Sequence, residues 1–321
     1  MQERWRIAGV ALAWTIAHSA AAALPQRAYV ANEHDGTVSE IDTQEDDVRR
    51  TIAVHGKSGD KLQAAVAERG GKWLFVVDAQ NSDVAVVDLS TSQVVVRIPV
   101  GKSPEGASLS PSGKELAVCG EDANAVDFID VATHKVTRSI KTQGKNPEHG
   151  EFSPDGKWLL TSNENSDDVD IIDLTAGKSV GLVHTGGHPR GIAILPDNRT
   201  AYVAQETTGN VDVLDIVDKK VLKSIATGLR PSGAIASADG KRVYVANGGA
   251  GNISVIDTAE GKVTGSVPVG KRAWNMALTR DNKKLYIANG RSDSVTVIDT
   301  ITLKPIKDIE VGALPWGVQI P

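Results

Sequence analysis

A repeat of about 42 residues runs through almost the whole chain and limits the folds it can adopt. Seven alternating apolar runs each end in an aspartate, and these aspartates lie 46, 42, 43, 42, 42 and 42 residues apart. They are Asp42, Asp88, Asp130, Asp173, Asp215, Asp257 and Asp299. Self-similarity at a fixed period of about 20 to 50 residues indicates a solenoid, a propeller or an array. The chain therefore consists of seven copies of one supersecondary unit.

Each unit carries four short strand patterns. A small-residue strand such as PRGIAIL comes first, a strand such as AYVAN follows a turn, then comes the run ending in aspartate, and an outer strand such as KVTGSVPVG completes the unit. Alternation with period two, punctuated by Gly, Pro, Asn and Asp, is typical of antiparallel strands. Four such strands in about 42 residues form one propeller blade. We predict an all-β fold, a seven-bladed β-propeller.

The two ends of the repeat complete each other. The first unit begins at Arg27 without an innermost strand, and the chain ends in ALPWGVQIP, which matches that strand in the other units. A single blade cannot bury both of its faces, so blades stack around a channel. We predict that the C-terminal strand completes the N-terminal blade and closes the ring. Residues 24–321 then form one domain, which we expect to be a monomer.

The N-terminal segment, residues 1–23, lies outside the repeats. Arg4 and Arg6 precede an apolar run at 7–17, and small residues follow at 19–23. This order is typical of a secretory signal peptide. The apolar run is shorter than the roughly 20 residues that a membrane span needs. We expect a periplasmic or secreted protein with no membrane span.

Charge, cysteine usage and motifs exclude several classes of function. The formal net charge is −5, which disfavours a nucleic-acid partner. Cys119 is the only cysteine, so no internal disulfide forms, and it replaces an alanine of other repeats, which is typical of a buried core thiol. The chain has no C-x-x-C-H motif, which excludes covalent haem, and no G-x-S-x-G or H-E-x-x-H motif. No established catalytic motif is present.

One residue of each innermost strand is predicted to lie at the channel mouth. Aligning these strands gives spacings of 42, 43, 42, 42, 42 and 42 residues, yet the residue type changes from acid to base to aromatic. A structural position would repeat one chemistry, so we predict a ligand- or partner-binding ring, although drift on an exposed rim would give the same variation. The ring comprises Gln63, Glu105, Glu148, Arg190, Ser232, Trp274 and Trp316, with His149 beside it.

The predicted mouth has two chemically different sides. Glu105, Glu148 and His149 form a side that suits a divalent cation, the one cofactor the residues themselves indicate. The opposite side carries arginines with Trp274 and Trp316, and suits a planar anion such as a carboxylated quinone. A tryptophan after a proline, as at Trp316, also plugs channels. Acids just after the second strands share this face but are typical of turns: Glu33, Glu121, Glu164 and Glu206.

The strands AYVAN, VYVAN and LYIAN, with ISVID and VTVID after the last two, resemble the YVTN family of propeller repeats. The segment VGKRAWNMALTRDNKKLYIANGRSDSVTVID and the final ALPWGVQIP are similar to periplasmic propellers associated with pyrroloquinoline-quinone-dependent alcohol catabolism. This resemblance implies an accessory or binding partner of a periplasmic quinoprotein or cytochrome rather than an enzyme. The insertion at 55–62 departs from the regular spacing.

Three functions remain open at this point. The first is a non-catalytic binding module that docks a partner or a small ligand on the mouth. The second is a metal-dependent lactonase or lyase, with Glu105, Glu148 and His149 as ligands of a divalent ion. The third is a structural surface or envelope protein. The fold does not choose among them, because propellers carry many unrelated activities.

Overall fold

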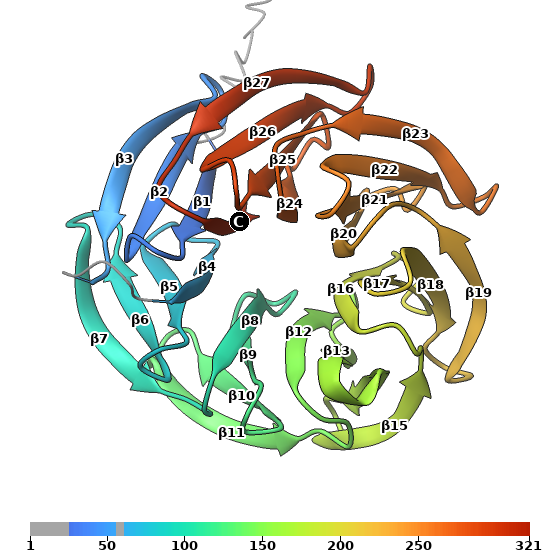
Figure 1. The fold of residues 1–321 in the computed structure, drawn as a ribbon. Coiled ribbons are helices and arrows are strands. Elements are labelled where there is room, and N and C mark those ends of the chain that lie inside the picture. The colour runs from blue at the N-terminus through green and yellow to red at the C-terminus, as the bar shows by residue number, and fades with distance from the viewer. Residues whose placement is uncertain (1–25, 56–60) are drawn as a thin grey trace, which may run out of the picture.

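The computed structural model describes residues 26–55 and 61–321. The predicted signal peptide, residues 1–23, lies outside the described residues. Seven four-stranded antiparallel sheets surround a central channel, as predicted (Figure 1). Within the described residues the only helical element is one short 3-10 helix, η1 (Glu164–Ser166). No helix in this part of the chain is long and apolar enough to cross a membrane.

From the channel outward, each blade consists of an innermost, a second, a third and an outer strand. The innermost strands are β4 (Leu62–Ala67), β8 (Pro104–Leu109), β12 (Pro147–Phe152), β16 (Pro189–Ile194), β20 (Pro231–Ala236), β24 (Ala273–Leu278) and β28 (Pro315–Gln319). The second strands are β1 (Arg27–Asn32), β5 (Trp73–Asp78), β9 (Glu115–Gly120), β13 (Trp158–Asn163), β17 (Thr200–Gln205), β21 (Arg242–Asn247) and β25 (Lys284–Asn289).

The outer half of each blade carries the repeated aspartates. The third strands are β2 (Thr37–Asp42), β6 (Asp83–Asp88), β10 (Ala125–Asp130), β14 (Asp168–Asp173), β18 (Asn210–Asp215), β22 (Asn252–Asp257) and β26 (Ser294–Asp299). The outer strands are β3 (Asp47–Ala53), β7 (Gln93–Pro99), β11 (Lys135–Lys141), β15 (Lys178–His184), β19 (Lys220–Ala226), β23 (Lys262–Pro268) and β27 (Lys304–Glu310).

The C-terminal strand closes the ring. β28 pairs antiparallel with β1, with Tyr29 opposite Gln319 and Val30 opposite Val318, so the first sheet has the order β28-β1-β2-β3. Figure 1 shows the red C-terminal strand lying beside the blue N-terminal blade. The prediction of closure by the last strand is confirmed.

The core lies between neighbouring blades. Second and third strands are almost wholly buried, whereas the residues of the outer strands are exposed or partly buried except for one buried residue near the end of each strand. At the seam, Val30 and Ile41 of the first blade pack with Tyr286 and Val297 of the last. Burying large side chains on both faces of each sheet removes much apolar surface from water and is the main force holding the ring together.

The repeated aspartates end each third strand and shape the turn that follows. Asp173 Oδ1 accepts hydrogen bonds from the backbone amides of Thr175 and Ala176, both at 2.9 Å. Asp88 accepts one from the amide of Ser90 at 2.8 Å. Asp side chains commonly form such turns. These aspartates therefore have a structural role in the turns, which explains why they recur in every blade.

Two local devices aim the first residues of the innermost strands at the channel. A non-glycine residue in the left-handed region precedes several of these strands, including His188 (φ 58°) and Arg230 (φ 54°). The ladder then shifts register, as between Pro189 and Ile192, so Arg190 and Gly191 stand outside the regular pairing. Bulges of this kind redirect side chains. The second residue of each innermost strand is thus presented at the mouth.

Candidate functional site at the channel mouth

The ring residues meet at one end of the channel but take different roles. The side chains of Gln63 and Ser232 are buried, and Ser232 Oγ donates to the carbonyl oxygen of Ala273 in the next blade at 2.9 Å. Ser232 therefore joins two blades. Trp274 is half-buried under the guanidinium of Arg272, whose Cζ lies 4.8 Å from the ring centroid. This stacking forms the arginine and tryptophan side of the mouth.

Trp316 crosses the channel from the first blade. Its Nε1 donates to Glu105 Oε1 at 3.3 Å, two blades further round the ring. Its ring stacks on His149, with centroids 5.6 Å apart and planes 26° from parallel. Only 6% of Trp316 is exposed. Trp316 thus closes part of the mouth while fixing Glu105.

Arg190 lies at the centre of a carboxylate cluster. Its guanidinium pairs with Glu148 and Glu206 and, through Nη2, with Glu164 Oε1 at 2.8 Å. Glu206 also accepts a hydrogen bond from Arg230 Nε at 2.8 Å. These contacts join a guanidinium to carboxylates and are therefore charge-assisted. Arg190 is only 13% exposed, so water screens them poorly. The cluster spans three neighbouring blades.

The acidic side holds more carboxylate groups than cations. Burial raises the pKa of Glu121 to about 9, and a hydrogen bond shared with Glu105 adds to this rise. Burial and the nearby negative charge of Glu105 raise the pKa of Glu148 well above its usual range. Burial also disfavours the Glu105 anion, but hydrogen bonds from Glu121 and Glu148 leave its pKa below the usual value. At neutral pH these carboxylates therefore hold protons between them.

One oxygen in this cluster lacks a donor. Glu148 is 1% exposed, and its buried Oε2 meets no N–H or hydroxyl donor in the described part of the chain, so any hydrogen bond it makes is with another carboxyl group such as that of Glu105. Leaving a buried acceptor unsatisfied costs about 1–3 kcal/mol, and more when it is charged. Such an oxygen is expected where a cation or a ligand completes the site.

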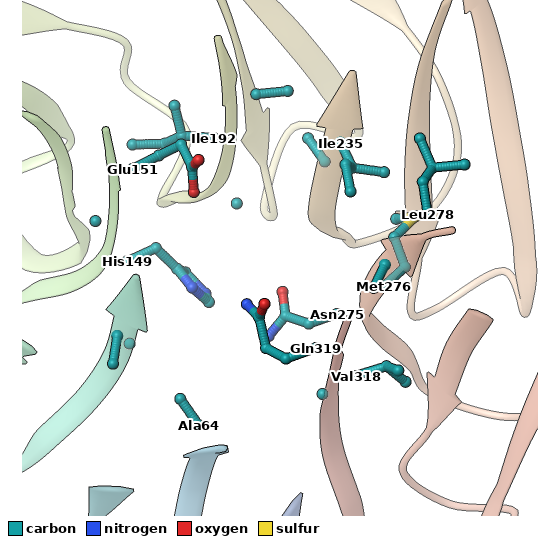
Figure 2. A pocket seen from close by; sticks show the side chains of 18 of the residues that line it. Ala64, His149, Glu151, Ile192, Ile235, Asn275, Met276, Leu278, Val318 and Gln319 are labelled. Atoms are coloured by element: carbon teal, nitrogen blue, oxygen red, sulfur yellow. The ribbon is translucent and has the colours of Figure 1, made fainter. Parts of the chain in front are cut away.

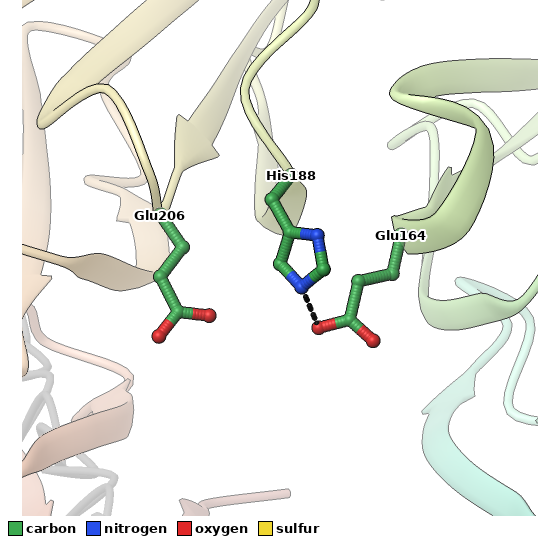
Figure 3. A group of neighbouring side chains, drawn as sticks. All are labelled: Glu164, His188 and Glu206. Atoms are coloured by element: carbon green, nitrogen blue, oxygen red, sulfur yellow. Dashed lines mark ion pairs between the residues drawn. The ribbon is translucent and has the colours of Figure 1, made fainter.

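The carboxylates converge in two groups among residues 26–55 and 61–321. In each group one ligand atom per residue lies within 4.8 Å of the others. The groups are Glu121, Glu148 and Glu164, and Glu164, His188 and Glu206. Figure 3 shows the second group, in which His188 Nε2 contacts Glu164. Glu164 belongs to both groups, so it joins them into one acidic surface.

The structure places the three metal ligands expected from the sequence near one another, but with His149 turned to another partner. His149 Nε2 is 3.5 Å from Glu148 Oε1, and its ring lies against Trp316. Burial, together with the positive charge of Arg190, lowers the pKa of His149 to about 4, so its imidazole is neutral at physiological pH. The loop acids Glu121 and Glu164, which the sequence suggested were turn formers, stand closer to the convergence point.

Below the mouth, the channel holds a cavity of about 290 Å³ (Figure 2). Its wall is formed by the innermost strands, including their glycines. A Cβ added to Gly191 would lie 2.7 Å from Ser232 O, so a larger residue there would push blades apart. Four longer polar side chains lie in the wall: His149, Glu151, Asn275 and Gln319.

Fold and site together define a closed seven-bladed β-propeller with an ionisable channel mouth. The chain belongs to the SMP-30/Gluconolactonase/LRE-like family, whose sequence model matches residues 63–291. No curated protein matches it in sequence.

Solved structures resemble this chain along most of its length. Kuenenia stuttgartiensis hydrazine synthase is 25% identical, with a TM-score of 0.77, covering 85% of this chain and 92% of that chain. A functionally unknown protein from Desulfotomaculum acetoxidans is 17% identical, with a TM-score of 0.78 over 92% and 98%. The dihydro-heme d1 dehydrogenase NirN in complex with DHE is 17% identical, with a TM-score of 0.67 over 91% and 74%. The two likenesses at 17% identity show a shared fold alone.

Proposed function

We propose that this chain is a non-catalytic binding propeller that holds a divalent cation at its channel mouth and, beside it, a small anionic ligand. The observation that carries the proposal is the convergence of Glu148, whose buried Oε2 meets no N–H or hydroxyl donor in the described residues, with Glu121 and Glu164. A buried carboxylate without a partner takes up a proton or pairs with a cation. Carboxylate oxygens are the ligands that Ca²⁺, Mg²⁺ and Mn²⁺ prefer.

The other side of the mouth supports the anionic ligand. Arg272 stacks on Trp274, and Arg230 is exposed beyond its contact with Glu206. Guanidinium groups bind carboxylates through two parallel hydrogen bonds, and an indole face stacks on a flat ring. A planar polycarboxylate such as pyrroloquinoline quinone combines both features.

The sequence supports a cellular setting for this binding role. A segment typical of a signal peptide and the resemblance to propellers of quinone-dependent alcohol catabolism both favour the periplasm. We therefore place the protein as an accessory of a periplasmic quinoprotein or cytochrome, which it would serve by docking the partner or its cofactor on the mouth.

Thermal unfolding of the chelated protein tests the cation site. Adding Mn²⁺ or Ca²⁺ at about one hundred times its dissociation constant should stabilise the native state by about 2.7 kcal/mol, a rise of a few degrees in Tm. The Glu148→Gln variant should lose this shift, whereas Glu45→Gln, on an exposed turn, should keep it. An unchanged shift in Glu148→Gln would refute the assignment. Titration with pyrroloquinoline quinone, with and without the cation, then tests the anionic side.

The family match favours lactone hydrolysis as a second candidate. A divalent ion at the mouth would supply Lewis acidity. Glu121 converges with Glu148 and Glu164, so it would serve as one of the ligands of this ion. An assay of gluconolactone hydrolysis, in which a pH-stat measures the acid released, distinguishes a lactonase from a non-catalytic binding protein. Turnover that is lost in Glu121→Gln would replace the non-catalytic proposal.

A further inference from the structure

We propose that the channel below the mouth is a second, separate binding site, which takes a small alkylammonium ion. The ammonium group would lie against the Glu151 carboxylate and the alkyl chain against the apolar side chains of the wall. The cavity of about 290 Å³ is large enough for a compact organic molecule rather than a single ion.

Among the described residues that line this cavity, Glu151 is the only one with a charged side chain at neutral pH. The other titratable residue in its lining is His149, which is neutral at physiological pH. Figure 2 shows the Glu151 carboxylate and the side chains of Asn275 and Gln319 projecting from the wall into the open space. In the described part of the chain, no side chain or backbone group pairs with this carboxylate. A lone carboxylate surrounded by protein favours a positively charged ligand.

Apolar side chains form part of the remaining wall. Ile192, Ile235, Met276 and Leu278 lie around the same cavity. An inorganic cation would gain nothing from this surface, whereas an alkyl chain of a few carbons would be removed from water by it, at about 0.8 kcal/mol for each CH₂. The amides of Asn275 and Gln319 remain available to accept hydrogen bonds from the ammonium group.

This site is distinct from the mouth. Glu151 lies three residues along β12 from Glu148, about 10 Å at the rise of a strand. Trp316, stacked on His149, lies on the mouth side of the cavity. The Glu151 side chain is exposed to the channel whereas Glu148 and Trp316 are buried, so the two carboxylates of β12 have different surroundings.

Isothermal titration at pH 8.5 with n-butylammonium, n-butanol and butyrate tests the proposal. At this pH an alkylammonium ion keeps its proton, as the lysine side chain does. We expect butylammonium to bind and the neutral and anionic analogues to bind at least about tenfold more weakly, because hydrogen bonds to charged groups are stronger than neutral ones.

Two variants locate the bound ion. Glu151→Gln, which keeps the shape of the side chain, should weaken butylammonium binding by at least about tenfold, and Ile235→Phe should weaken it by filling the apolar side. Glu148→Gln should bind as the wild type does, because its carboxylate belongs to the mouth. Equal affinity for butanol, unchanged binding in Glu151→Gln, loss in Glu148→Gln or no binding by the wild type would each overturn the proposal. A failed cation shift at the mouth would leave this result unaffected.

Discussion

Replacing Arg190 by methionine tests how the mouth is held together. The substitution keeps the apolar length of the side chain but removes the guanidinium that pairs with Glu148, Glu164 and Glu206. Removing one partner of a buried ion pair costs about 3–5 kcal/mol, because the remaining charge stays buried without compensation. With Arg190 at 13% and Glu148 at 1% exposure, we expect a loss in this range at pH 8 in the absence of divalent cations.

The penalty should depend on pH in a defined direction. Without the guanidinium, the pKa of Glu148 in the folded protein, already raised by burial, rises further above its unfolded value, and Glu206 loses a positive charge that lowers its pKa, so the variant loses stability as pH rises. We expect the destabilisation at pH 5.5 to be at least about 1.4 kcal/mol smaller than at pH 8, the effect of one proton over one pH unit.

Urea unfolding, followed by far-ultraviolet circular dichroism at both pH values, measures these differences. Arg69→Met, at an exposed turn, is the control for loss of an arginine. In a Glu148→Gln background the Arg190 substitution should lower the free energy of unfolding by less, since one of the carboxylates that would be left unpaired is absent. A loss below about 1 kcal/mol, or the same loss at both pH values, would show that the cluster is solvated and refute the reasoning.

Three further predictions concern other parts of the molecule. The chelated wild type should lose stability as pH rises from 4.5 to 9, because Glu121 ionises in the unfolded chain above pH 4.5 but keeps its proton in the folded protein up to about pH 9. Glu121→Gln should flatten this slope in urea titrations, and an unchanged slope would contradict the assignment. Gly191→Ala should lower Tm far more than Gly70→Ala, whose added Cβ meets only a flexible side chain; equal shifts would contradict the close approach of the strands. Trp316→Ala should cost about 3–5 kcal/mol in chemical unfolding, and a loss below about 1 kcal/mol would mean the ring is not packed as described.

The sequence predicts the fold almost completely because the repeat is strict. Alternation gives the strands, the spacing of the aspartates gives the blades, and the missing first innermost strand gives the closure. The alignment of innermost strands also places Glu105, Glu148 and Arg190 at one end of the channel. The partners of these side chains could not be predicted, because spacing along the chain does not determine which residue a long side chain contacts across a narrow channel.

Two contacts illustrate this limit. Trp316 reaches Glu105 two blades away, although a whole blade, β4 to β7, lies between them in the ring. Glu121 and Glu164 enter the cluster from loops whose acids are usually turn formers. One signal was available: a glutamate follows the second strand in four of the seven blades, at Glu33, Glu121, Glu164 and Glu206, where an ordinary turn would vary.

The pairing of β28 with β1 has a consequence for how ligands act on the molecule as a whole. Open arrays of repeats can unravel from one end, since each unit contacts only its neighbours. Here the two ends of the repeat are joined by antiparallel strand pairing. Trp316 lies on the last strand of this pair and also contacts Glu105 and His149 across the channel. A ligand seated at the mouth would clamp the seam as well as fill a site. We expect its binding to slow the opening of the entire ring, so that protection from proteolysis would extend to blades that the ligand never touches.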